Sequence, residues 1–108
     1  MDERSTAWLA GLLEGEGSFL VRNRRGTIRP IVEVAMTDFD VIERVAVIVG
    51  NTIAVKRTKG VRKELFRIRV EGARAEAVMR AILPYMGERR SYAITTILDQ
   101  YQGSKRAA

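Results

Sequence analysis

Residues 8–19 read WLAGLLEGEGSF, and the fold prediction rests on this stretch. Its apolar residues recur at helical spacing, namely Trp8, Leu9, Leu12 and Leu13. We therefore expect a helix that has Ser5 or Thr6 as its N-cap and that ends at the glycines after residue 14.

Two glycines, Gly11 and Gly15, lie four residues apart and so on one side of this helix. A glycine inside a helix costs about 1 kcal/mol relative to alanine. One interpretation is that the pair lets a second helix approach backbone to backbone. The other is that Gly15, with Gly17, only ends the helix while Gly11 is tolerated. The two residues alone leave both interpretations open.

Glu14 and Glu16 stand at the end of the same helix, where the negative pole of the helix dipole disfavours carboxylates. A bound divalent cation would reverse the local field, so an acid here is reasonable as a metal ligand. The alternative is two surface glutamates in a charged protein. Because the chain has no cysteine and no histidine, oxygen ligands for magnesium or calcium are the metal chemistry that fits.

The rest of the chain predicts two β-hairpins and three further helices. The strands are expected at residues 18–24, 28–36, 52–58 and 63–71, with turns at Arg25-Gly26-Thr27 and Lys59-Gly60. The helices are expected from an N-cap at Thr37 to a stop at Gly50, at residues 73–83 before Pro84, and at residues 89–101. This order predicts an α+β domain over residues 1–101, with helices on one face of a four-stranded sheet, and a flexible tail at residues 102–108.

Positive charge is concentrated in the two hairpins. The net charge is +6, and residues 20–70 hold twelve basic and five acidic residues. Strand alternation puts apolar side chains on one face of each hairpin and basic ones on the other. The positive field of such a face attracts DNA, RNA or an anionic membrane surface. For any single strand, the alternative interpretation is that its basic residues only face solvent. Because both hairpins repeat the pattern, we expect a nucleic-acid interface.

We expect this interface to bind double-stranded DNA in the major groove. The expected contact residues are Leu20, Arg22, Arg24, Arg25, Arg29, Ile31, Glu33, Lys56, Arg57, Lys59, Arg62, Lys63, Arg67 and Arg69. An RNA-binding sheet usually displays aromatic residues for stacking, and the expected outward faces carry none. The chain has no run of 18 apolar residues and starts with the acidic MDERST. We therefore expect a soluble, intracellular protein with no membrane partner and no small-molecule substrate.

Residues 9–17, LAGLLEGEG, match the LAGLIDADG motif position by position, and Trp8 and Ser18-Phe19 fit its usual flanks. The chain resembles a single-motif LAGLIDADG homing endonuclease over nearly its whole length, including the LPYM at residues 83–86 followed by Arg89 and Arg90. The resemblance implies an αββαββα fold, with a saddle-shaped, antiparallel, four-stranded sheet and helices on one face.

The resemblance also implies roles for individual residues. Glu16, with Gly15 beside it, would bind Mg²⁺, with Ca²⁺ or Mn²⁺ able to substitute in binding. Glu16, Arg89 and Asp38 would be the catalytic residues. Arg89 would lie near the scissile phosphate, where the family commonly has lysine, and Asp38 would organise water. The homodimer interface would comprise Trp8, Leu9, Gly11, Leu12 and Gly15.

The implied function is a site-specific double-strand DNA endonuclease that acts as a homodimer on a long, near-palindromic site. Metal-dependent hydrolysis would need no histidine. The alternative is a LAGLIDADG-fold DNA-binding protein that cuts weakly or not at all, acting as a regulator or splicing helper. Arg89 keeps this alternative open, because arginine cannot act as a base and differs from lysine in reach.

Overall fold

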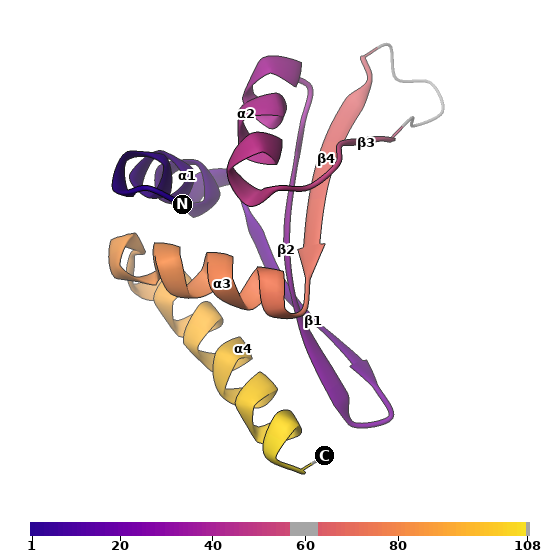
Figure 1. Ribbon diagram of the computed structural model, residues 1–108, viewed down its shortest axis with the longest axis vertical. Helices are drawn as coiled ribbons and strands as arrows, with labels where there is room; N and C mark the ends of the chain where they lie inside the picture. Colours follow the sequence, from indigo (N-terminus) through magenta and orange to yellow (C-terminus); the bar gives the residue numbers. More distant parts are fainter. Residues whose placement is uncertain (57–62, 108) are drawn as a thin grey trace.

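The computed structural model describes residues 1–56 and 63–107, without the side chains of Lys56 and Ala107. Its elements follow the order α1 (Glu3–Glu16), β1 (Ser18–Arg24), β2 (Thr27–Met36), α2 (Phe39–Val49), β3 (Ala54–Lys56), β4 (Leu65–Glu71), α3 (Ala73–Ile82), the 3-10 turn η1 (Leu83–Tyr85) and α4 (Glu88–Ala107). The four helices lie on one side of the sheet (Figure 1). This is the predicted α+β architecture.

The four strands form one antiparallel sheet in the order β1-β2-β4-β3. Alternate residues of β2 and β4, including Val32, Val34, Ile68 and Val70, enter the hydrophobic core beneath the helices. Their neighbours along each strand point to the opposite side, which we call the open face. The open face therefore carries the side chains that the helices do not cover.

The tip of the first hairpin consists of two residues with positive backbone φ angles. Arg24 pairs with Thr27, so Arg25 and Gly26 make a two-residue loop with φ of 53° and 86°. Consecutive positive φ angles are typical of the turns that match the right-handed twist of a hairpin. Asn23 Oδ1 accepts a hydrogen bond of 3.0 Å from the Gly26 amide. The turn thus falls where the sequence predicts it, although Thr27 already belongs to β2.

Helix α1 starts earlier than the sequence predicts. Asp2 is the N-cap, and its side chain accepts a hydrogen bond of 2.7 Å from the Ser5 amide. This bond lowers the pKa of the Asp2 carboxyl. The predicted caps, Ser5 and Thr6, lie inside the helix because the Asp2 carboxylate offers an acceptor one turn before them.

The later helices also differ from the prediction at their ends. The N-cap position of α2 is Asp38 rather than Thr37, and α2 stops at Gly50, as predicted, with φ of 68°. Helix α4 continues to Ala107 instead of ending at Tyr101. Ser104 explains the extension, because its Oγ accepts a hydrogen bond of 3.0 Å from the Ile28 amide and donates one of 3.1 Å to the Gly26 carbonyl. None of the described helices is long and apolar enough to cross a membrane.

Candidate active site and nucleic-acid interface

Small residues occupy the exposed side of α1. Ala7, Gly11 and Gly15 are exposed and follow one another at intervals of four residues. A Cβ built on Gly11 or Gly15 meets nothing within 4 Å. Neither glycine is therefore required by the packing of the described part of a single chain. Gly15 lies inside α1 and so does not end the helix, and the open space beside both glycines leaves room for a second helix.

The other residues predicted for a dimer interface divide into two groups. Leu9 is fully buried in the chain's own core, so its prediction as an interface residue is wrong. The helix turns Leu9 toward the sheet because it shares a face with Leu13 rather than with Gly11. Trp8 and Leu12 are half-buried at the border, and the Arg44 guanidinium lies 4.0 Å from the centre of the Trp8 ring.

Glu16 is the last residue of α1 and is exposed. Within residues 1–56 and 63–107 its carboxylate has neither a hydrogen bond nor an ion pair. Gly17 follows in an extended conformation, and a Cβ there would lie 2.8 Å from the Leu13 carbonyl oxygen. Gly17 is thus required for the close turn that leads from the acid into β1. The described residues contain no group of three acidic, histidine or cysteine side chains that could hold a metal ion.

Glu14 has a partner that the sequence does not reveal. Its Oε1 accepts a hydrogen bond of 2.6 Å from the amide of Gly87, which immediately precedes α4. Its backbone carbonyl accepts one of 3.0 Å from Arg90 Nε, and the Arg90 guanidinium also lies 5.3 Å from the centre of the Phe19 ring. The end of α1 is therefore bound directly to the start of α4.

The two remaining predicted catalytic residues are both exposed. Arg89 lies in the first turn of α4, next to the anchored Arg90, and its side chain makes no hydrogen bond or ion pair within the described part of the chain. Asp38 precedes α2 but makes no side-chain capping hydrogen bond. Both side chains are free to contact a ligand. Their predicted roles remain predictions.

The basic residues at the centre of the open face are held by two acids. Arg69 lies 3.3 Å from Glu33 and 3.1 Å from Glu71, and Arg22 lies 3.0 Å from the same Glu71 oxygen. Arg67 is 4.0 Å from Glu33, while its buried Nε has no hydrogen-bond partner in the described residues. Each of these side chains is about one-third exposed or less. The central charge is therefore partly neutralised, and its guanidinium groups are fixed in orientation.

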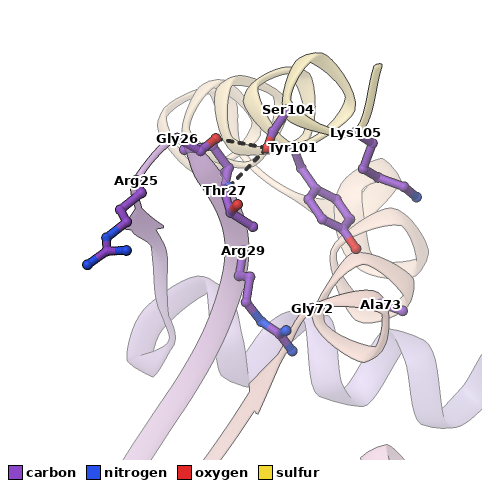
Figure 2. Close-up of a pocket in the computed structure, with 10 residues that line it drawn as sticks. Arg25, Gly26, Thr27, Arg29, Gly72, Ala73, Tyr101, Ser104 and Lys105 are labelled. Atoms are coloured by element: carbon purple, nitrogen blue, oxygen red, sulfur yellow. Dashed lines mark hydrogen bonds between the residues drawn. The ribbon is translucent and has the colours of Figure 1, made fainter. Parts of the chain in front are cut away.

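The basic residues near the hairpin tip differ from this central network. Arg24, Arg25 and Arg29 are exposed and have no hydrogen bond or ion pair among residues 1–56 and 63–107. Arg29 extends toward the start of α3, where a Cβ on Gly72 would lie 2.8 Å from its Nη2. A cavity of about 660 Å³ lies there, between the hairpin and the end of α4. Figure 2 shows Arg29 and Tyr101 extending toward Gly72 and Ala73, and Arg25 pointing away.

Some predicted DNA contacts change in the structure. Ile31 belongs to the open face but is only 3 % exposed, so its prediction as a contact is wrong. It lies between Leu20 and Glu71 on the neighbouring strands, which shield it. Leu20 is 44 % exposed and Lys63 is also exposed. The predictions for Arg57, Lys59 and Arg62 and for the Lys56 side chain lie outside the described residues.

The described structure is similar to those of several homing endonucleases. No family model matches the sequence, and no curated protein matches it significantly. The homing endonuclease I-CvuI, in complex with uncleaved I-CreI target in the presence of magnesium, has a TM-score of 0.63 and 18 % identity, over 91 % of this chain and 66 % of its own. The group I intron-encoded I-CeuI, complexed with DNA, has a TM-score of 0.62 and 14 % identity, over 91 % of this chain and 54 % of its own. The LAGLIDADG meganuclease I-AabMI, bound to uncleaved DNA, has a TM-score of 0.59 and 11 % identity, over 94 % of this chain and 37 % of its own.

This chain has the LAGLIDADG homing endonuclease fold. At these identities the similarity shows the fold alone, and the chain spans slightly less than two thirds of I-CvuI and about half of I-CeuI. The fold prediction is confirmed, including the position of residues 9–17 as the end of α1. In this LAGLIDADG fold, the exposed glycines and Glu16 lie on one helix, and the open face lies on the sheet that follows it.

Proposed function

We propose that two copies of this chain form a magnesium-dependent, site-specific double-strand DNA endonuclease. The observation that carries the proposal is Glu16, an exposed carboxylate without a partner among the described residues, at the end of a helix whose exposed side is glycine at positions 11 and 15. Two α1 helices packed along these glycines around a twofold axis would bring both Glu16 carboxylates together. A second copy would thus complete the ligand set.

The donor chemistry at the end of α1 fits a hard divalent cation. Glu16 offers a carboxylate, and Gly15 offers one of the last carbonyl groups of the helix, which have no partner within the helix itself. Oxygen donors suit magnesium and calcium. The similar I-CvuI was solved with the I-CreI target in the presence of magnesium and with its own target in the presence of calcium. When bound, such an ion polarises a phosphodiester and lowers the pKa of a water molecule, which is the chemistry that hydrolysis requires.

The open face supports DNA as the substrate. Arg24, Arg25 and Arg29 are free to bind backbone phosphates, which gives affinity without sequence selection. Arg22 and Arg69 are held by acids, so they present guanidinium groups in fixed orientations, as base recognition in the major groove requires. Two such faces related by a twofold axis would select a near-palindromic site.

Arg89 and Asp38 are proposed to assist the reaction without binding the metal. Because arginine cannot act as a base, we assign Arg89 the stabilisation of negative charge on the scissile phosphate rather than proton transfer. Its free, exposed side chain supports this assignment. Asp38, exposed before α2, is proposed to order water near the reacting phosphate.

A selection experiment tests the function. Purified protein is used to select duplexes from a randomised library in calcium, and the bound pool is then transferred to magnesium and its ends are mapped. We expect a long, near-palindromic consensus that is cut on both strands in magnesium. Sequence-specific binding with no cleavage in magnesium or manganese would instead support the non-cleaving DNA-binding alternative.

A further inference from the structure

The ends of α1 and α4 exchange hydrogen bonds although they lie 73 residues apart in the sequence. Glu14 Oε1 accepts from the Gly87 amide at 2.6 Å, and Gly87 occupies the N-cap position of α4, since its carbonyl accepts the Ser91 amide. In return, Arg90 Nε donates to the Glu14 carbonyl oxygen at 3.0 Å. Each helix thus satisfies a backbone group that the other leaves unpaired at its end.

The charges of this exchange match both helix dipoles. The Glu14 carboxylate lies at the positive N-terminal end of α4, and the Arg90 guanidinium lies at the negative C-terminal end of α1. The distance from Arg90 Nε to Glu14 Oε2 is 3.8 Å. The Arg90 side chain is only 14 % exposed and lies over the Phe19 ring, which fixes it against the start of β1. An acid at the end of α1 is unfavourable for α1 alone, and its partner in α4 explains why it is there.

Gly87 allows the Glu14 carboxylate to approach this closely. A Cβ at residue 87 would lie 2.9 Å from Glu14 Oε1, too close for the carboxylate to keep its present position. The two acids of the motif therefore differ. Glu16 is free among the described residues, whereas Glu14 is occupied by the α4 backbone.

We propose that Glu14 is a positioning residue that holds Arg89 in register with Glu16. This inference rests on the proposed nuclease function. Arg89 lies between the two anchored residues, Gly87 and Arg90, and Glu16 lies two residues after Glu14. The exchange of hydrogen bonds therefore fixes the start of α4 relative to the end of α1, and with it the base of the Arg89 side chain. Glu14 contributes to the rate through this geometry and does not bind the metal.

Amide hydrogen exchange in the DNA-free protein tests the contact itself. In Glu14→Ala, the Gly87 amide should exchange at least about tenfold faster than in the wild type, because it loses its acceptor. Glu14→Gln keeps an oxygen acceptor and should retain most of the protection. Glu43→Ala, which removes an exposed acid of α2, is the matched control and should leave residue 87 unchanged. Unchanged exchange in Glu14→Ala overturns the inference, whether or not the protein cuts DNA.

Single-turnover cleavage at saturating DNA tests the consequence. We expect Glu14→Ala to lower the rate by about tenfold to a hundredfold, the range typical of a misplaced catalytic group, with the DNA Kd within about twofold of the wild type. Gly87→Ala should act in the same direction, and Glu14→Gln should restore most of the rate. A wild-type rate in Glu14→Ala, or a shifted magnesium midpoint that indicates a metal ligand, overturns the inference. A wild type that never cuts refutes the nuclease proposal instead, and amide exchange then decides the role of Glu14 in capping α4.

Discussion

Replacing Gly11 with alanine should affect the single chain and the dimer in opposite directions. A Cβ at residue 11 meets nothing within 4 Å in the chain, so the substitution should stabilise the isolated domain by about 1 kcal/mol through helix propensity. For a domain of this size, that gain raises Tm by roughly 4 °C. If two α1 helices meet at Gly11, the two new methyl groups overpack the seam at a cost of about 1–3 kcal/mol. The dimer Kd should then rise about fivefold to 140-fold.

Sedimentation and thermal unfolding separate the two effects. The dimer Kd is measured by sedimentation across a concentration series, and Tm is measured at concentrations where the protein is monomeric. Gly103→Ala is the matched control, because Gly103 is also exposed, helical and without neighbours within 4 Å of a Cβ. It should raise Tm but leave the dimer Kd unchanged. A Gly11→Ala protein that dimerises as tightly as the wild type would refute the helix seam, and so would a protein that is monomeric both with and without DNA.

Two further substitutions test the hairpin end of the molecule. Ser104→Ala removes both hydrogen bonds between α4 and the hairpin, so it should destabilise the fold by about 1–2 kcal/mol in urea unfolding. Thr96→Ala, which removes only a bond within α4, is the control. Equal urea midpoints for the two variants would show that the Ser104 bonds contribute nothing. Arg29→Ala should weaken DNA binding equally for all sequences and reduce the slope of log Kd against log salt by about 1. Arg69→Ala should alter sequence preference, because it removes a guanidinium group at the centre of the open face and leaves Glu33 with Arg67 alone. A change of preference in Arg29→Ala would contradict its assignment to the phosphate backbone.

The sequence predicts those parts of the fold that depend on local patterns. Strand alternation and a short turn containing Gly26 predict the first hairpin, and β1 begins and ends where expected. The glycine at residue 50 predicts the end of α2 because a left-handed residue there costs glycine little. These features depend on neighbouring residues, so a single sequence contains enough information to find them.

The features that the sequence does not predict depend on contacts between distant segments. The partner of Glu14 is Gly87, and the partner of Ser104 is the first hairpin, so neither contact has a local pattern. The N-cap at Asp2 is a local exception: Asp2, Ser5 and Thr6 all offer a side-chain oxygen, and the sequence pattern alone does not choose among them. Ile31 alternates as an outward residue, yet neighbouring strands bury it. For Glu14, Ser104 and Ile31, tertiary contacts decide between arrangements that the local sequence allows equally.

The role of Glu16 is tested most directly by comparing the wild type with Glu16→Gln on the selected DNA site, at equal occupancy and in saturating magnesium. Glutamine keeps the size of the side chain but removes the charge that a divalent cation requires. We predict that the wild type cuts both strands, and that the variant binds with a similar Kd and does not cut. Cleavage by Glu16→Gln at the wild-type rate would contradict the assignment of Glu16 as the metal-binding carboxylate.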